Sequence, residues 1–335
     1  MRIKELEIYR CPITGSKLKL VNPVIVQDQV QEALLINDDG KEYTINNSIP
    51  DFTWPKELAE IDEETRAHYD KLADEYEKFA DIPFQTFKQS NEEVREKITS
   101  KLELKPNYKV LEIGGGDGRG AEYILKYLND EGELYFQELS PSFLRQAIKR
   151  LKKFERKVNY SIANASYLSF PDNYFDAAHH FGGISTFAEK ERCLKELCRV
   201  VKPGGKIVIG DEGIGPWLKD TQMAKIMINS NPLIGVAVPI ESIPVEAREV
   251  CVEWIMLGAF YIIDFKVGEG EPIADYYINI PSERGGNHWS RFYGRLEGIS
   301  ETTKKLAYEA QRKSGMSMHD WLDTIIAREA QNQIK

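Results

Sequence analysis

Predicted strands and helices alternate through the middle of the chain. Apolar runs indicate strands at residues 110–113, 134–138, 159–163, 175–181 and 206–210, and helical patterns lie at 120–128, 140–154 and 189–201. Short buried strands separated by helices of this length are typical of parallel β–α–β units. Residues 259–265 and 273–280 look like a closing antiparallel pair joined through Gly268 and Gly270. The pattern predicts an α/β fold with a seven-stranded mixed sheet and helices on both of its faces.

The segments on either side of this core have different patterns. Residues 1–53 contain short strand-like runs and a turn at 38–40, which predicts a small β module with a hairpin. Helices are expected at about 60–79 and 91–102, and a helical insert at about 213–258. We therefore divide the chain into the β module at 1–53, a core with its lid insert at 54–280, and a helical extension at 281–335.

Composition and charge limit the classes of protein to which this chain can belong. The chain has 335 residues, a net charge of −9 and four widely spaced cysteines, and its mean hydropathy is −0.43. Its longest apolar stretches, such as 254–263, are too short for a membrane span, and no secretory leader is evident. The acidic balance argues against general nucleic-acid binding. We expect a cytoplasmic globular protein with reduced thiols.

A glycine-rich loop directly follows the first core strand. Residues 114–120 contain five glycines, which is more than a tight turn requires, and they open a helix. Residues 116–121 match the dinucleotide pattern G-x-G-x-x-A, and Glu138 follows at the distance expected of a ribose-binding acid. This loop alone would indicate a nicotinamide dinucleotide.

The carboxylates around the loop favour a different nucleotide ligand. Glu112 ends the strand and Asp117 lies within the loop, so a pyrophosphate here would face nearby anions. At an effective dielectric constant of about 20, two unit charges about 4 Å apart interact by about 4 kcal/mol. S-adenosylmethionine (SAM) carries a sulfonium and an ammonium and no phosphate. The charges therefore favour SAM.

Four segments resemble the motifs of class I SAM-dependent methyltransferases, in the order of that family. They are the glycine loop with its strand at 110–118, the acid at 138–141, the 164–176 segment with its L-S-F-P-D-N-Y-F-D run, and the R-V-V-K-P-G-G turn at 199–205. The resemblance covers about residues 69–211 and is strongest to the quinone-biosynthesis and natural-product branch. It implies a Rossmann-like fold and SAM as the cofactor.

The resemblance also implies roles for individual residues. Glu112 and Gly114 would hold the methionine end of SAM, and Gly116 and Gly118 would permit its close approach. Glu138 would accept from the ribose hydroxyls. Asn164 stands where the family usually has Asp, so its contact to the adenine amine would be uncharged. Two further residues, which are as well suited to core packing, would flank the adenine ring: Leu139 and Ala165.

Methyl transfer needs a base only for some acceptors, so no fixed triad is expected. We select His180, at the end of the fourth strand, and His288, in a polar and aromatic segment, as candidate catalytic residues. A structural histidine and a packing loop are the alternatives. Other candidates are His179, Asp211, Glu212, Arg291 and Tyr293. The apolar insert would form an acceptor pocket, ordinary core or the contact of a homodimer.

The N-terminal module resembles the zinc-ribbon-like domain that precedes some methyltransferases, but it lacks the metal ligands. Cys11 is the first cysteine and Cys193 the second, and no histidine precedes His68, so four zinc ligands are not available. We expect no metal. The resulting hypothesis is methyl transfer to an O, N or C atom of a small-molecule metabolite, as in natural-product biosynthesis. The alternatives are a peptide or rRNA methyltransferase and a non-catalytic SAM-binding protein.

Overall fold

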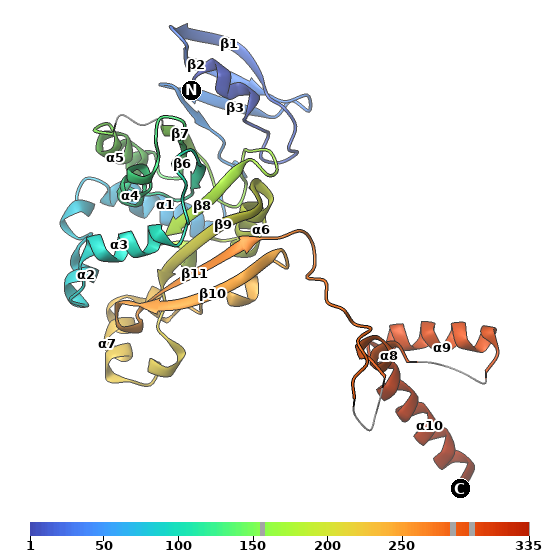
Figure 1. The fold of residues 1–335 in the computed structure, drawn as a ribbon. Coiled ribbons are helices and arrows are strands. Elements are labelled where there is room, and N and C mark those ends of the chain that lie inside the picture. The colour runs from blue at the N-terminus through green and yellow to red at the C-terminus, as the bar shows by residue number, and fades with distance from the viewer. Residues whose placement is uncertain (155–157, 282–285, 295–298, 335) are drawn as a thin grey trace. The chain divides into compact units, whose positions relative to one another are not determined.

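The computed structural model describes residues 1–154, 158–281, 286–294 and 299–334. The chain divides into two compact units, Met1–Glu271 and Pro272–Lys335. All the strands of the described residues lie in the first unit and are hydrogen-bonded into one sheet, whose strands Figure 1 labels in part. The described part of the second contains α8 (His288–Tyr293), α9 (Glu301–Ser314) and α10 (Met318–Ile334).

The predicted α/β core is confirmed. Five parallel strands follow the order β7-β6-β5-β8-β9, and two antiparallel strands, β11 and β10, extend the sheet beyond β9. The bounds of the parallel strands are Lys109–Glu112 for β5, Glu133–Glu138 for β6, Val158–Ile162 for β7, Phe175–Phe181 for β8 and Val201–Glu212 for β9.

Helices cover both faces of this sheet because its strands are apolar on both sides. Val110 packs in one core cluster and the next residue, Leu111, packs in the other, as the two-residue period of a strand requires. One cluster receives side chains of α6 (Lys190–Val200). The other receives side chains of α3 (Asn91–Ser100), α4 (Arg119–Tyr127) and α5 (Pro141–Leu151). Mostly parallel sheets are stable only when both faces are buried in this way.

Of the two strands predicted to form the closing antiparallel pair, one is present and the other is not. The expected strand at 259–265 is β11 (Phe260–Val267), but it pairs with β10 (Ala247–Ile255), which the sequence pattern had assigned to the helical insert. Residues 273–280 contain no strand. Left-handed backbone at Met256, Leu257 and Gly258 makes the hairpin between the two strands. β10 is an edge strand with many partly exposed residues, so its apolar pattern is weak.

The insert after β9 is helical only in its first part. It contains α7 (Gln222–Ser230) and 3-10 turns at Pro216–Leu218, Pro232–Gly235 and Ile240–Ser242. The chain then enters β10, so the helical pattern ends before residue 247 and not at 258.

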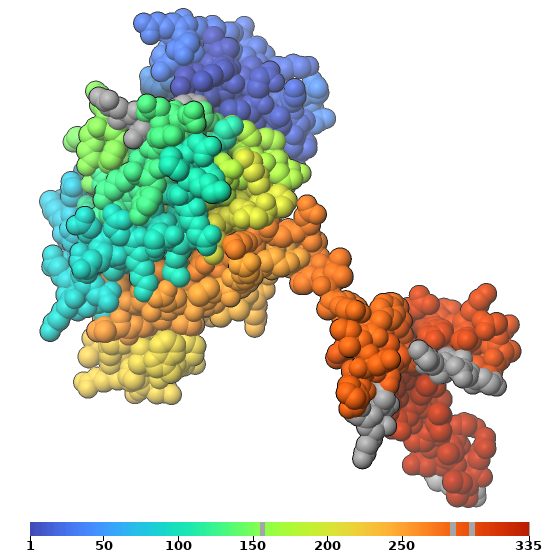
Figure 2. Space-filling model, in the orientation of Figure 1, coloured from blue at the N-terminus to red at the C-terminus, as the bar shows by residue number. Residues whose placement is uncertain are grey.

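The N-terminal strands continue the core sheet. They are β1 (Lys19–Val26), β2 (Gln29–Ile36), β3 (Glu42–Asn46) and β4 (Ile49–Asp51), and the predicted turn at 38–40 does join β2 to β3. β4 pairs with β7 in parallel, through Asp51 opposite Ile162. Tyr9 and Phe52 lie in the same core cluster as the strands of the core. In Figure 2 the blue surface of these residues meets the green surface of the core directly.

Two further observations concern membranes and metals. No helix in the described ranges combines the length and the apolar character that crossing a membrane requires. Within the same ranges, no group of three or more His, Cys, Asp and Glu side chains is arranged to hold a metal ion. In the N-terminal module, Cys11 Sγ lies 3.2 Å from the hydroxyl of Tyr43, in a buried contact.

Candidate functional site

A cleft opens at the carboxyl ends of β5, β6 and β8, where parallel α/β sheets bind ligands. The glycine loop forms one wall. Gly114, Gly116 and Gly118 have φ values of +51°, +59° and +84°, which favour glycine. A Cβ atom at Gly118 would lie 3.2 Å from the Cα atom of Ala147, so this loop also packs tightly on α5. The backbone of the loop is left bare toward the cleft.

Glu112 ends β5 and its carboxylate lies inside the cleft. It is 2% exposed, and its Oε1 lies 3.1 Å from Nδ1 of His179, its neighbour in the paired strand β8. Its Oε2 has no hydrogen-bond partner in the described part of the chain. A buried carboxylate oxygen without a partner is costly, so it favours a ligand that brings a donor or a positive charge.

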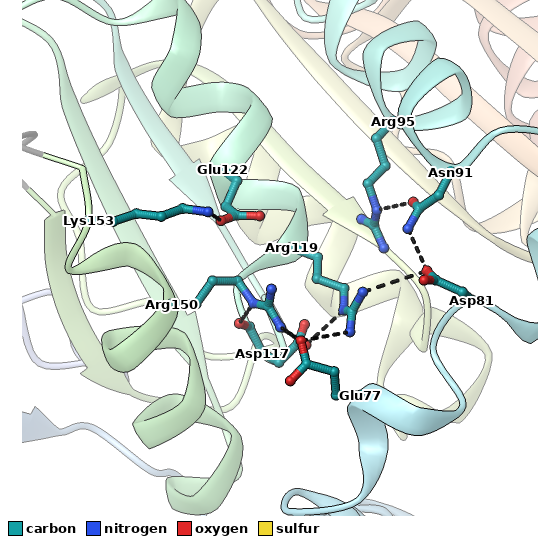
Figure 3. Close-up of polar contacts among 9 residues, drawn as sticks. All are labelled: Glu77, Asp81, Asn91, Arg95, Asp117, Arg119, Glu122, Arg150 and Lys153. Atoms are coloured by element: carbon teal, nitrogen blue, oxygen red, sulfur yellow. Dashed lines mark hydrogen bonds and ion pairs between the residues drawn. The ribbon is translucent and has the colours of Figure 1, made fainter.

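Asp117 does not present the free charge that the sequence argument assigned to it. Its Oδ2 lies 2.9 Å from Nε of Arg119 and 3.0 Å from Nη2 of Arg150 (Figure 3). Two guanidinium groups therefore neutralise this carboxylate. The electrostatic argument against a pyrophosphate thus depends on Glu112 and not on Asp117.

Glu138, the last residue of β6, is held by backbone amides. The N–H of Gly116 donates to its Oε2 and the N–H of Ser140 donates to its Oε1, both at 2.8 Å. Burial is the largest influence on this carboxyl group and raises its pKa, while these amide hydrogen bonds act in the opposite direction. The two amides fix the orientation of the carboxylate, and each oxygen retains a lone pair for a ligand hydroxyl.

Asn164 lies beyond β7 and lines the cleft together with Leu139 and Ala165. Its Oδ1 accepts from the N–H of Ser166 at 3.0 Å, and its Nδ2 donates to Asp62 Oδ2 at 3.3 Å. Asp62 belongs to α1 (Glu60–Leu72), and sequence reasoning had not selected it. The amide therefore has a carboxylate partner, which explains how Asn can stand where the family usually has Asp.

His180 of β8 lines the cleft. Its Nδ1 lies 2.8 Å from the carbonyl oxygen of Ile113, so this nitrogen is the donor. Its Nε2 is buried without a partner among the described residues. Burial is the main cause that lowers the pKa of His180. The free Nε2 lone pair can therefore accept a proton or a hydrogen bond from a ligand.

Of the remaining candidate polar residues, Asp211 and Glu212 belong to the first compact unit and His288 belongs to the second. Asp211 accepts from the N–H groups of Gly183 and Ser185 at 2.8 and 2.7 Å, so it orders the loop after β8. Glu212 lines the cleft, and burial raises its pKa. His288 begins α8 in the second unit and is exposed. Its catalytic role stays a prediction, as do those of Arg291 and Tyr293 on the same helix.

Aromatic side chains form much of the remaining wall. Phe143 of α5 lies between Tyr69 and Tyr76, with ring centroids 5.2 and 5.0 Å away. The helix expected at about 60–79 ends at Leu72, so Tyr69 lies on α1 and Tyr76 on a separate 3-10 turn, Tyr76–Lys78. Sequence reasoning did not indicate that these two rings would line the cleft. Phe84 and Phe260 also line the cleft although they are far apart in sequence.

Comparison with known proteins agrees with this geometry. Residues 111–209 match the model of a methyltransferase domain family. The domain is a class I SAM-dependent methyltransferase domain. SAM, the predicted cofactor, is the cofactor that such methyltransferase domains use.

Relatives of this methyltransferase domain are known from several bacteria. The ubiquinone/menaquinone biosynthesis C-methyltransferase UbiE of Laribacter hongkongensis is 36% identical over 106 residues, which are 32% of this chain and 43% of that protein. The UbiE protein of Bordetella avium is 30% identical over 162 residues, 48% of this chain and 59% of that protein. The chain thus spans about half the length of these relatives.

A solved structure supports the fold of the methyltransferase domain. Phosphoethanolamine N-methyltransferase 2 of Haemonchus contortus, in complex with S-adenosyl-L-methionine, has a TM-score of 0.50 and 15% identity. The match covers 76% of this chain and 69% of that chain. At this identity the likeness concerns the fold alone.

Proposed function

We propose that the protein transfers a methyl group from SAM to a small-molecule acceptor. The observation that carries this proposal is the pair of buried carboxylates at the carboxyl ends of β5 and β6. Glu112 has an Oε2 without a partner among the described residues, and Glu138 is oriented by the N–H groups of Gly116 in the glycine loop and of Ser140 after β6. One carboxylate suits an ammonium group, and the other suits a pair of ribose hydroxyls.

The residues of the cleft fit SAM along its length. In this proposal Glu112 and Gly114 bind the methionine end, and Gly116 and Gly118 allow the ligand to approach the backbone. Glu138 accepts from both ribose hydroxyls. The adenine ring lies beside three residues at the far end of the cleft: Leu139, Asn164 and Ala165.

His180 is the residue proposed to accept a proton. When bound, SAM supplies a methyl group on a positively charged sulfur. Transfer of this methyl group to an acceptor atom would break the carbon–sulfur bond and leave S-adenosylhomocysteine (SAH) as a neutral thioether. The neutral Nε2 of His180 takes the proton that a hydroxyl or carbon acceptor loses. Proximity and exclusion of water supply the rest of the acceleration.

The acceptor is proposed to be apolar and of the size of a metabolite. Phe84, Phe181, Leu233, Met256 and Phe260 line the cleft. The UbiE relatives are C-methyltransferases of quinone biosynthesis, so phenols and hydroquinones are the first acceptors to examine. Carbon or oxygen of such a ring is the proposed methylation site.

Two measurements test the proposal. Isothermal titration calorimetry should show binding of SAM and SAH and no binding of NAD. An assay of SAH release over a panel of phenols, hydroquinones and short peptides should then show turnover with a ring compound. Absence of SAM binding would refute the proposal. Turnover with peptides alone would favour a macromolecular acceptor, and binding with no turnover at all would favour a SAM-binding protein that transfers no methyl group.

A further inference from the structure

Arg95, which lines the cleft, has two guanidinium nitrogens without a hydrogen-bond partner among the described residues. Arg95 lies on α3, is partly buried and lines the cleft. Its Nε donates to Oδ1 of Asn91 at 2.7 Å, and Nδ2 of Asn91 donates to Oδ1 of Asp81 at 2.7 Å (Figure 3). Neither Nη atom makes a hydrogen bond or an ion pair with the residues that the structure describes. Asn91 thus fixes the orientation of a guanidinium fork whose outer edge is free.

Two carboxylates close to Arg95, those of Asp117 and Asp81, are already engaged by other groups, and Glu112, whose charge also acts on Arg95, makes no ion pair with it among the described residues. Asp117 pairs with Arg119 and Arg150 at 2.9 and 3.0 Å. Asp81 accepts from Asn91 and lies 3.6 Å from Nη1 of Arg119. The charge of Arg95 therefore lacks a direct counterion, and burial lowers the pKa of Arg95.

A second arginine of the cleft, Arg66 on α1, differs in its surroundings. Asp70 lies one helical turn away from it on the same helix, and the charge of Arg66 helps to lower the pKa of Asp70. On α3, Asn91 and Thr99 lie four residues from Arg95, and Glu92, three residues away, is exposed and makes no ion pair with Arg95 among the described residues. Instead the ring of Phe84 lies 5.8 Å from its guanidinium carbon.

We propose that Arg95 is an anion subsite of the cleft and binds the carboxylate of a ligand through its two Nη groups. The planar fork of a guanidinium matches a carboxylate in two parallel hydrogen bonds. The inference rests on the proposed function, in which the cleft holds both SAM and the acceptor. Two ligands could bring this carboxylate: the amino-acid end of the cofactor, or an acid group on the acceptor ring.

The test compares ligands with and without a carboxylate on the full chain. Calorimetry measures the affinity of SAH, of 5′-methylthioadenosine, which lacks the amino-acid end, and of benzoate added to the SAH complex. The variants are Arg95→Met, which removes the charge, and Arg95→Lys, which keeps the charge but not the fork. Arg145→Met is the matched control, because Arg145 is exposed on α5 and is not part of the cleft lining.

Loss of a bidentate, charge-assisted pair should weaken binding by about 30- to 100-fold. If the cofactor brings the carboxylate, Arg95→Met weakens SAH by this factor and leaves 5′-methylthioadenosine unchanged. If the acceptor brings it, SAH is unchanged and benzoate binding is lost. Arg95→Lys should fall between the wild type and Arg95→Met in either case.

Unchanged affinity for both SAH and benzoate in Arg95→Met would overturn the subsite, as would an equal loss in Arg145→Met. Failure of the proposed function has a different signature, since the wild type would then bind neither SAH nor 5′-methylthioadenosine. Thermal unfolding of each variant shows whether the fold is intact, and Arg95→Lys supplies the comparison if Arg95→Met does not fold.

Discussion

At the scale of single residues, the cleft depends on buried polar groups whose partners are backbone amides or other side chains. Glu138, Asp62 and His180 line the cleft, and each is held in place by hydrogen bonds within the protein. Such groups are oriented before a ligand arrives, so little ordering accompanies binding. Substitutions here should alter binding more than they alter the fold.

Glu138→Gln should weaken SAM binding with only a small loss of stability. The amide keeps one acceptor for the N–H of Gly116 or Ser140, but it cannot accept from two hydroxyls and two amides together. We expect a loss of about 2 kcal/mol, which is about 30-fold in Kd. Calorimetry with SAM measures this loss, and an unchanged Kd would contradict the role of Glu138 in ribose binding.

His180 should give methyl transfer a characteristic pH dependence. Its pKa is lowered by burial, so the imidazole stays unprotonated until the pH falls below its ordinary value of 6.5. The rate should therefore be level from about pH 7 to 9 and decrease only at more acidic pH. A profile of kcat against pH tests this, with His319→Gln, an exposed histidine of α10, as the control. A rate that already falls between pH 8 and 7 would exclude His180 as the base.

The pair of Asp62 and Asn164 can be tested by exchanging the two side chains. Asn164→Asp places a second carboxylate beside Asp62, where the present nitrogen–oxygen distance is 3.3 Å. Two like charges at this distance should lower the free energy of unfolding by about 2 kcal/mol at neutral pH. The double variant Asp62→Asn with Asn164→Asp should recover most of this loss. Urea unfolding measures it, and no recovery would show that the pair is not coupled.

At the scale of elements, the N-terminal module supports the segment that follows β7. Phe52 N–H donates to the carbonyl of Ile162 at 2.8 Å, and Arg10 N–H donates to that of Ser169 at 2.9 Å. The ring of Tyr9 lies 5.6 Å from that of Phe170 and 4.8 Å from that of Phe52. Asn164 and Ala165 lie between these attachments. The module therefore contributes to the shape of the end of the cleft that we propose for adenine.

Tyr9→Ala should lower both stability and cofactor affinity. It removes a fully buried ring from the core cluster that module and sheet share, which typically costs about 3 kcal/mol or more. Val24→Ala, at a site 51% exposed on β1, should have little effect. Thermal unfolding and SAM calorimetry check both variants. Equal effects of the two would show that the module does not support the cleft.

At the scale of the whole molecule, the described residues that line the cleft come from one of the two compact units. That unit is Met1–Glu271. A protein that ends at residue 271 should therefore bind SAH with a Kd within about twofold of the full chain, because no lining group is removed. Calorimetry on both proteins tests this. A large loss of affinity would show that the second unit takes part in binding and would favour a role for His288.

The sequence alone determined the parallel core, the glycine loop, and the two acids Glu112 and Glu138. These follow from local signals, since apolar strands, glycines and acids at strand ends lie within one β–α–β repeat. The position of β10 was missed because pairing with β11 depends on neighbours across the sheet and not on its own weak pattern.

Which charges of the cleft are paired and which are free becomes visible in the folded structure and not in the sequence. From the sequence, Asp117 is expected to be an unpaired negative charge. In the structure, Arg150, a residue 33 positions away, neutralises it. Asp62 and Asn164 meet across 102 positions, and Arg95 shares the cleft with Phe260. The strength of a charge depends on distance and burial, which are properties of the folded chain. Residue type and spacing are enough to name the cofactor class, whereas the free guanidinium of Arg95 emerges only from the packing of α3 against the cleft.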